Sequence, residues 1–286
     1  MAAVLLVQVY FLREDLFELF GPYGIFQESV TRYLVDPAVP RLPWFTPTLA
    51  SWGINENTAL MATAVIYTVS LVCLCLGVAT RLAAVVAWGL HWILMNTGLC
   101  SNYGADVYAH VFLFYLIWMP SGDVWSLDSL IRKEKKPPSD IARMSIRVIQ
   151  LQLCITYFVS AWEKAAGPQW WSGEVIWRAL TLPVYIQWDM TWMAHYPWFA
   201  KLAAWGTLVA EFGYALFIWP RQTRWLWISL MVSLHIGIIV FLGLGLFGAI
   251  MTCFTLAAFG ISAEPQPFRR SSSVASPLLA KTPLGV

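Results

Sequence analysis

Six ionisable residues stand inside or at the ends of long apolar runs of this sequence: His91, Asp106, His110, Lys164, Glu211 and His235. An ionisable side chain is costly in such surroundings, so each is a candidate functional residue. Carboxylate, imidazole and amine groups in an apolar setting can accept, donate or relay protons. Their spacing matches no metal-ligand cluster, nucleophile elbow or phosphate-binding loop. We therefore expect proton chemistry or helix packing at these positions, and no metal site.

Lys164 ends an apolar run, shortly before a Gly-Pro pair and two tryptophans. Gln150, Tyr157 and Lys164 are seven residues apart, so a helix would place them on one face. Ser160 falls on the same face, and a polar face of a membrane helix points into the bundle or a cavity. A lysine desolvated there can act as a general base at neutral pH. A lysine at a helix end can equally extend to the headgroups and only anchor the helix. The spacing is compatible with both roles of Lys164, as a general base and as a helix anchor.

Asp106 and His110 are four residues apart, so a helix would bring their side chains together. A carboxylate in that position can fix the tautomer of the imidazole. The pair can equally be an interfacial polar pair that ends a helix. His91, Glu211 and His235 lie in the middle of apolar runs, where hydrogen bonds between helices and the lining of a site both explain them.

The composition places these residues in a membrane. Of the 286 residues 59% are hydrophobic and 12% are charged, against about 25% charged residues in soluble domains. The net charge of +2 and the scattered basic residues give no reason to expect a nucleic-acid partner. The seventeen tryptophans suit a chain that crosses membrane–water interfaces repeatedly. We expect an integral membrane protein whose surface contacts lipid.

The apolar runs predict an all-α, multi-pass transmembrane helical bundle of about seven to eight spans around an outward-facing cavity. They cover residues 57–80, 82–100, 105–121, 144–165 and 199–220, a run over 225–260 that the glycines at 243–248 divide in two, and a short segment within 1–20. Segments 21–56 and 166–198 are rich in proline, glycine or tryptophan, and we expect them outside the membrane.

Basic residues in the 122–143 loop place that loop in the cytoplasm. The ends of the helices at Asp106 and Lys164 then lie together on the outer side. Residues 261–286 are rich in serine and proline, so we expect a disordered cytoplasmic tail. A single membrane domain would therefore cover residues 1–260.

Four stretches occur in a suggestive order. The first ends in a Trp-Ser-hydrophobic-Asp motif at 125–128, and the second, at 157–173, holds a tyrosine, Lys164 and a Trp-x-x-Gly segment. A helix with Glu211 and a helix with His235 follow. Over roughly residues 10–260, this order resembles the vitamin K-dependent γ-carboxylase-like membrane domain, also called the horizontally transferred transmembrane (HTTM) domain.

The resemblance implies that Lys164 is a catalytic base acting on a reduced, vitamin K-like quinone, whose oxygenated product makes the base for carboxylation. Asp106 and His110 would orient or polarise the substrate. Tyr157, Glu211 and His235 would line the cofactor cavity. The carboxylases also carry a histidine at a position that corresponds to Ala105 here, so this chain departs from the full carboxylase pattern.

Three functions therefore stay open. The first is a quinone-dependent enzyme, in the plasma membrane of a bacterium, that modifies or matures an exported peptide. The second is a non-catalytic membrane scaffold, chaperone or immunity module that binds a membrane protein partner. The third is a transporter, although no internal repeat relates two halves of the chain.

Overall fold

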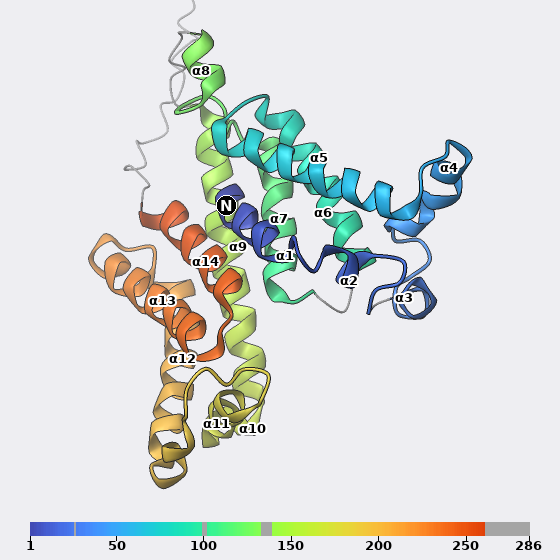
Figure 1. Cartoon of the computed structure of the whole chain (residues 1–286). Coiled ribbons are helices and arrows are strands. Elements are labelled where there is room, and N and C mark those ends of the chain that lie inside the picture. Colours follow the sequence, from blue (N-terminus) through green and yellow to red (C-terminus); the bar gives the residue numbers. More distant parts are fainter. Residues whose placement is uncertain (26, 99–101, 133–138, 261–286) are drawn as a thin grey trace, which may run out of the picture.

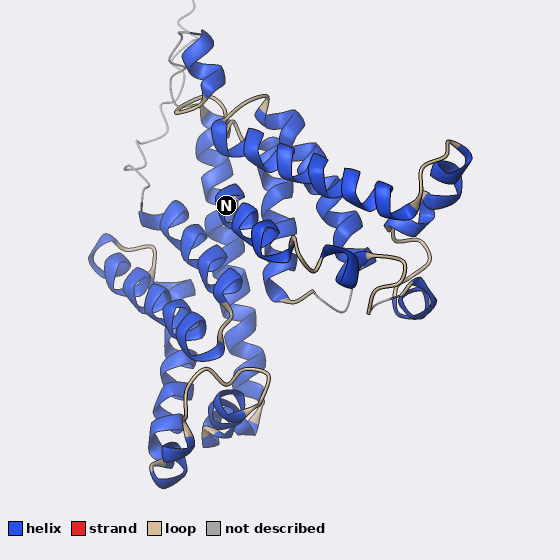
Figure 2. Ribbon diagram, viewed as in Figure 1, coloured by secondary structure: helices blue, strands red, loops and turns tan. Residues whose placement is uncertain are grey.

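The computed structural model describes residues 1–25, 27–98, 102–132 and 139–260. Every regular element in these ranges is a helix (Figure 2), which confirms the all-α prediction. The predicted tail, residues 261–286, lies outside the described residues. The segment 133–138 also lies outside the described residues. It holds three of the basic residues from which the cytoplasmic placement of the 122–143 loop was predicted.

The chain begins with short helices and continues into three long ones (Figure 1). The elements up to residue 118 are α1 (Ala2–Leu12), α2 (Leu16–Phe20), α3 (Glu28–Leu34), η1 (Leu42–Trp44), α4 (Thr46–Ser51), α5 (Glu56–Leu76), α6 (Thr80–Thr97) and α7 (Gly104–Trp118). We call α1 to α7 the N-terminal half.

Helix α8 (Leu127–Arg132) leads into the C-terminal half, which begins with the longest helix of the chain. Its elements are α9 (Asp140–Ala166), α10 (Pro168–Ser172), α11 (Glu174–Thr181), η3 (Thr191–His195), α12 (Pro197–Phe217), α13 (Arg221–Leu242), α14 (Gly245–Thr255) and the π-helical turn η4 (Leu256–Gly260).

Each of the seven main predicted runs contains a helix, and the 225–260 run divides where the glycine cluster predicted. Helices α5, α9 and α13 are long and apolar enough to cross a membrane. Helices α1 and α7 and the segment Gly245–Gly260 are shorter apolar helices. These helices fit a membrane protein, while the number of spans stays a prediction.

The two halves share one core. In the N-terminal half α6 packs between α5 and α7, and in the C-terminal half α12 packs between α9 and α13. Helix α14 lies against α13 and also contacts α1 and α7, so it joins the halves (Figure 1). Buried apolar side chains from both halves form one continuous cluster, which includes Leu5, Leu71, Phe112, Leu153, Tyr214, Met231 and Met251.

Local sequence sets the helix ends. The Asn55 side chain caps α5 by accepting a hydrogen bond from the Thr58 N–H, and Ser139 caps α9 through the Ala142 N–H. Gly243 has a φ of +70° and ends α13, a backbone conformation that favours glycine. The turn between α13 and α14 follows directly from that glycine.

The Trp-Ser-Leu-Asp motif closes the turn between α5 and α6. The Asp128 carboxylate accepts a hydrogen bond of 2.8 Å from the Ala79 N–H. A Cβ atom on Gly77 would lie 2.3 Å from the Ser126 Cβ, so only glycine allows this close approach. In this chain the motif therefore fixes a helical hairpin.

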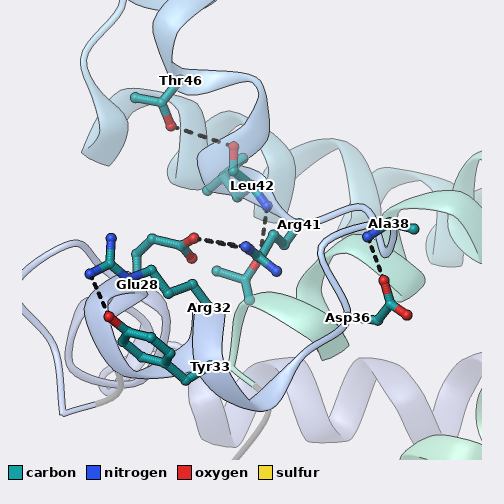
Figure 3. A network of polar contacts seen from close by, with 9 residues as sticks. Glu28, Arg32, Tyr33, Asp36, Ala38, Arg41, Leu42 and Thr46 are labelled. Atoms are coloured by element: carbon teal, nitrogen blue, oxygen red, sulfur yellow. Dashed lines mark hydrogen bonds and ion pairs between the residues drawn. The ribbon is translucent and has the colours of Figure 1, made fainter.

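The segment 28–46 is fastened to the end of α6 through Leu42, and Figure 3 shows the polar contacts within this segment. The buried Arg41 side chain forms an ion pair with Glu28 of α3 at 3.0 Å. This ion pair holds the loop that comes after α3 against that helix. The next residue, Leu42, donates its N–H to the Thr97 hydroxyl at 2.9 Å. These contacts hold η1 against α6, and η1 also contacts α4 and α5.

Candidate functional site

Lys164 forms an ion pair between two helices. Its Nζ lies 2.5 and 2.6 Å from the two carboxylate oxygens of Glu211 on α12 and 2.7 Å from the Ser160 hydroxyl. The Glu211 side chain is 6% exposed and that of Lys164 is 23% exposed. The lysine therefore turns toward the neighbouring helix, where it neutralises a buried carboxylate.

Tyr157 lies two turns before Lys164 and connects α9 to α13. Its hydroxyl is 2.8 Å from Nε2 of His235, and both side chains are buried. The Tyr157 ring packs edge-on against Tyr214, with 4.6 Å between ring centroids. Within residues 1–25, 27–98, 102–132 and 139–260, the Nδ1 atom of His235 and the Tyr214 hydroxyl are buried without a hydrogen-bond partner.

Gln150 completes the polar face of α9. Its amide nitrogen donates to the Ala258 carbonyl in η4 at 2.7 Å, and its amide oxygen accepts from Arg147 at 2.9 Å. The predicted face of Gln150, Tyr157 and Lys164 therefore points into the bundle, and each residue reaches a different element. Gln150 contacts η4, Tyr157 contacts α13 and Lys164 contacts α12.

Asp106 belongs to a second polar cluster, in the N-terminal half. Its carboxylate accepts hydrogen bonds from the Gln8 side chain on α1 at 2.9 Å and from the Tyr103 N–H at 3.1 Å. The contact with Tyr103 is half of a capping box that starts α7. The Asp106 carbonyl lies 3.1 Å from Nε2 of His91, whose Nδ1 lies 3.0 Å from the Tyr67 hydroxyl.

His110 does not join this hydrogen-bond network. Among the described residues, no hydrogen bond links it to the Asp106 carboxylate, whose two oxygens accept from Gln8 and Tyr103. Its ring lies among the rings of Trp88, Trp92 and His91, with the nearest centroid 4.5 Å away, and its Nδ1 is buried without a partner in the described part of the chain. Of the two arrangements that the spacing allowed, the structure does not form the carboxylate–imidazole pair.

Two cavities border Asp106, and both are also lined by Gln8. The first, of about 350 Å³, lies among α1, α5 and α6, and we call it the α1–α5–α6 groove. The second, of about 580 Å³, reaches from α1 to the turn between α13 and α14. Neither cavity is lined by Lys164, Glu211 or His235. The structure pairs Lys164 with Glu211. The two cavities border Asp106 instead of this ion pair.

Sequence reasoning missed Gln8 and Tyr67. Gln8 is a polar residue in a short apolar segment, and Tyr67 is one aromatic residue in an otherwise aliphatic stretch of α5. Neither has a periodic partner on its own helix, so no pattern pointed to a site. Their partners, Asp106 and His91, were both candidates because they are ionisable residues in apolar runs.

The electrostatic character of the two clusters differs. The C-terminal cluster contains the ion pair between Lys164 and Glu211. The Asp106 carboxylate instead accepts hydrogen bonds from two neutral N–H donors. Within the described ranges, no group of three or more His, Cys, Asp or Glu side chains could hold a metal ion. Both clusters consist of groups that donate, accept and transfer protons.

The chain was compared with known proteins. The family model described as the HTTM domain matches residues 25–261. Neither the curated proteins nor the solved structures gave a match.

Proposed function

This chain belongs to the HTTM family, and on that premise we propose that it is a quinone-dependent membrane enzyme that modifies or matures an exported peptide. The observation that carries the proposal is the contact between Lys164 and Glu211. It places an amine and a carboxylate at hydrogen-bond distance, largely buried between two helices. Such a pair is suited to general acid–base chemistry.

Lys164 would act as the base of the reaction. When the shared proton is on Glu211, Nζ is a neutral amine that can accept a proton. When the proton is on Nζ, the carboxylate stabilises the ammonium ion. The Ser160 hydroxyl, 2.7 Å from Nζ, keeps the side chain in place. Tyr157, His235 and Glu211 stay candidates for contact with the cofactor, and Asp106 and His110 stay candidates for orienting the substrate.

A reduced, vitamin K-like quinone would supply a phenolic hydroxyl whose deprotonated form reacts with oxygen. Two polar atoms in the cluster of Lys164 could meet such a hydroxyl: within the described ranges, Nδ1 of His235 and the Tyr214 oxygen are buried without a hydrogen-bond partner.

The tryptophan-rich segment beside Lys164 is the proposed binding face for the peptide. The Lys164 Nζ lies 5.4 Å from the centre of the Trp170 ring, so the ion pair is next to α10. Exposed tryptophans continue from there along the segment 166–198, at Trp171, Trp188, Trp192 and Trp198. Large exposed aromatic side chains are typical of surfaces that bind a partner.

A non-catalytic scaffold is the second candidate, and the same ion pair favours it. A lysine held by a buried carboxylate can serve only to lock α9 to α12. The two functions differ in whether Lys164 must lose its proton. Arginine retains the positive charge and the ion pair but does not become neutral in proteins.

The test measures oxygen-dependent consumption of reduced menaquinone-4 in membranes that contain the parent protein, Lys164→Ala or Lys164→Arg. The enzyme hypothesis expects consumption by the parent and its loss in both variants, with quinone binding retained. Lys201→Ala is the matched control, because Lys201 is an exposed lysine of α12. Full consumption by folded Lys164→Arg would show that Lys164 is not the base. A parent that consumes nothing would favour the scaffold.

A further inference from the structure

We infer that the second cavity binds a cationic side chain of the exported peptide, a lysine or an arginine, and that the Asp106 carboxylate forms an ion pair with it. This cavity lies between α1, the start of α7 and the turn from α13 to α14, and we call it the α1–α14 cavity. The inference rests on the proposed function in taking an exported peptide as the partner, and it adds the feature of the peptide that is recognised. Asp106 is thereby assigned as a peptide-binding residue.

Asp106 is a buried carboxylate whose partners in the chain are neutral. Its side chain belongs to a residue that is 4% exposed, and its oxygens accept hydrogen bonds from the Gln8 amide and the Tyr103 N–H. Among the described residues, no lysine, arginine or histidine forms an ion pair with it. A carboxylate has about four acceptor positions, so the remaining ones are available to a ligand.

The start of α7 keeps this carboxylate charged and in place. Asp106 lies in the first turn of the helix, where the N-terminal end of the helix stabilises a negative charge. The capping-box contact with the Tyr103 N–H, at 3.1 Å, fixes the side chain at the border of the cavity. A fixed anion beside an open space is suited to bind a cation.

The walls of the cavity favour an organic cation over a metal ion. They are mostly aliphatic and aromatic, with Val7 and Phe11 from α1 and Leu246 from α14. A metal ion needs several oxygen or nitrogen ligands, whereas the side chain of lysine or arginine brings its own apolar stem. Aromatic rings such as those of Phe11 and Tyr103 also attract cations through their faces. The volume of about 580 Å³ is within the usual range of ligand sites.

The cavity adjoins the proposed binding face for the peptide. In the tryptophan-rich segment, Trp188 donates its indole N–H to the Val240 carbonyl at 2.8 Å, near the end of α13. Its neighbour Gln187 lies against Gly243, where an added Cβ would be 2.8 Å from the Gln187 amide nitrogen. Gly243 itself lines the cavity. A peptide bound along this segment can therefore place one side chain in the cavity.

The cavity would hold the peptide at a position apart from the one that reacts. It is not lined by Lys164, the proposed base. The tryptophan-rich segment begins beside Lys164, whose Nζ is 5.4 Å from the centre of the Trp170 ring, and it reaches the cavity at Gln187. The ion pair with Asp106 would thus fix the register in which the peptide lies across this segment.

The experiment uses the full chain in phosphatidylcholine nanodiscs. The probes are two radiolabelled tripeptides, acetyl-Leu-Lys-Leu-amide and the same peptide with an Nε-acetylated lysine, which keeps the stem and loses the charge. We expect the parent to bind the lysine peptide about tenfold more tightly, as for a hydrogen bond to a charged group. Asp106→Asn should remove this preference. When one leucine is replaced by photo-leucine, crosslinks should fall on α1 and the start of α14.

Glu163→Gln is the matched control, because Glu163 is an exposed carboxylate on α9 that does not line the cavity. If Asp106→Asn does not fold, Gly245→Leu tests the same point. Gly245 lines the cavity, and a Cβ added to it meets nothing within 4 Å, so a leucine there should occupy part of the cavity and weaken binding. Gly237→Leu in α13 is its control, because Gly237 is equally open and does not line the cavity.

Several results would overturn the inference. The parent could bind both tripeptides equally or bind neither, Asp106→Asn and Gly245→Leu could bind like the parent, or the crosslinks could fall outside α1 and α14. Phosphatidylethanolamine carries a primary ammonium group in its headgroup. If adding it to the nanodiscs displaces the lysine peptide from the parent, the cavity binds a lipid amine and the peptide assignment is wrong.

The failure of this inference and the failure of the proposed enzyme can be told apart. If the parent consumes reduced menaquinone-4 but shows no preference for the charged tripeptide, the proposed function stands and the inference fails. If the parent prefers the charged tripeptide through Asp106 but consumes no quinone, the inference stands and the enzyme hypothesis fails.

Discussion

Two tyrosine–histidine pairs, one in each half of the molecule, have the same chemistry and different surroundings. The Tyr67 hydroxyl lies 3.0 Å from Nδ1 of His91, and the Tyr157 hydroxyl lies 2.8 Å from Nε2 of His235. The first pair borders the groove between α1, α5 and α6. The second is enclosed by aromatic rings, including those of Tyr214 and Phe247.

Helix length accounts for the difference. Helix α1, with 11 residues, packs against α5, and the groove lies among α1, α5 and α6. The C-terminal half packs helices of 27, 21 and 22 residues, α9, α12 and α13, around its polar groups. A hydrogen-bonded pair can meet a ligand where a short helix leaves space, and it holds helices together where long helices close around it.

The largest expected effect contrasts the charged cluster with the neutral one. Lys164→Ala leaves the Glu211 carboxylate, which is 6% exposed, without its cation, and should lower the free energy of unfolding by about 3–5 kcal/mol. Adding Glu211→Gln should recover most of this loss, because it removes the buried charge. Unfolding in mixed detergent micelles measures both variants.

Asp106→Asn is the counterpart in the N-terminal half. An amide oxygen can still accept from Gln8 or Tyr103, so we expect a loss of only about 0.5–1.5 kcal/mol. If Lys164→Ala costs no more than Asp106→Asn, the ion pair does not hold the C-terminal half together, and the contrast between the clusters is wrong.

Two glycines test how closely the halves are packed. A Cβ on Gly213 in α12 would lie 2.0 Å from the Trp227 ring, whereas one on Gly89 in α6 would meet nothing within 4 Å. Gly213→Ala should cost about 1–3 kcal/mol through overpacking. Gly89→Ala should be neutral or stabilise by up to about 1 kcal/mol. Thermal unfolding of both variants under the same conditions compares them, and equal shifts would argue against tighter packing at Gly213.

The two tyrosine–histidine pairs should respond differently to loss of the hydroxyl. Tyr157→Phe leaves both ring nitrogens of His235 buried without partners among the residues that the structure describes, and should lower the free energy of unfolding by about 1–3 kcal/mol. Tyr67→Phe should cost less, about 0.5–1.5 kcal/mol, because water or a ligand in the groove can reach His91. Unfolding of the ligand-free proteins measures both values. A larger loss for Tyr67→Phe would mean that the groove pair is the structural one.

The smallest effect is expected at the exposed ion pair between Glu174 and Arg178 in α11. Its two side chains are 48% and 74% exposed, and they are four residues apart on one helix. Arg178→Ala should change the free energy of unfolding by about 0.3–0.5 kcal/mol. Added salt should weaken this pair and leave the contact between Lys164 and Glu211 nearly unchanged. A salt dependence of the buried pair would show that water reaches it.

The sequence by itself determined the helices, their ends and the faces that they bury. Apolar runs, the cap residues Asn55 and Ser139 and the glycine at 243 are local signals, and each acts within a few residues of its own position. The spacing of Gln150, Tyr157 and Lys164 is local too, which is why the buried polar face of α9 could be predicted.

Only the tertiary structure decided which groups meet. Lys164 pairs with Glu211, 47 residues away, and the Asp106 carboxylate pairs with Gln8, 98 residues away, whereas the spacing had offered His110 as one possible partner. Helical periodicity fixes the direction of a side chain on its own helix, but it does not say which helix lies opposite. That choice depends on the packing of all the helices together. So does the groove, which Tyr67 lines and from which Tyr157 is absent.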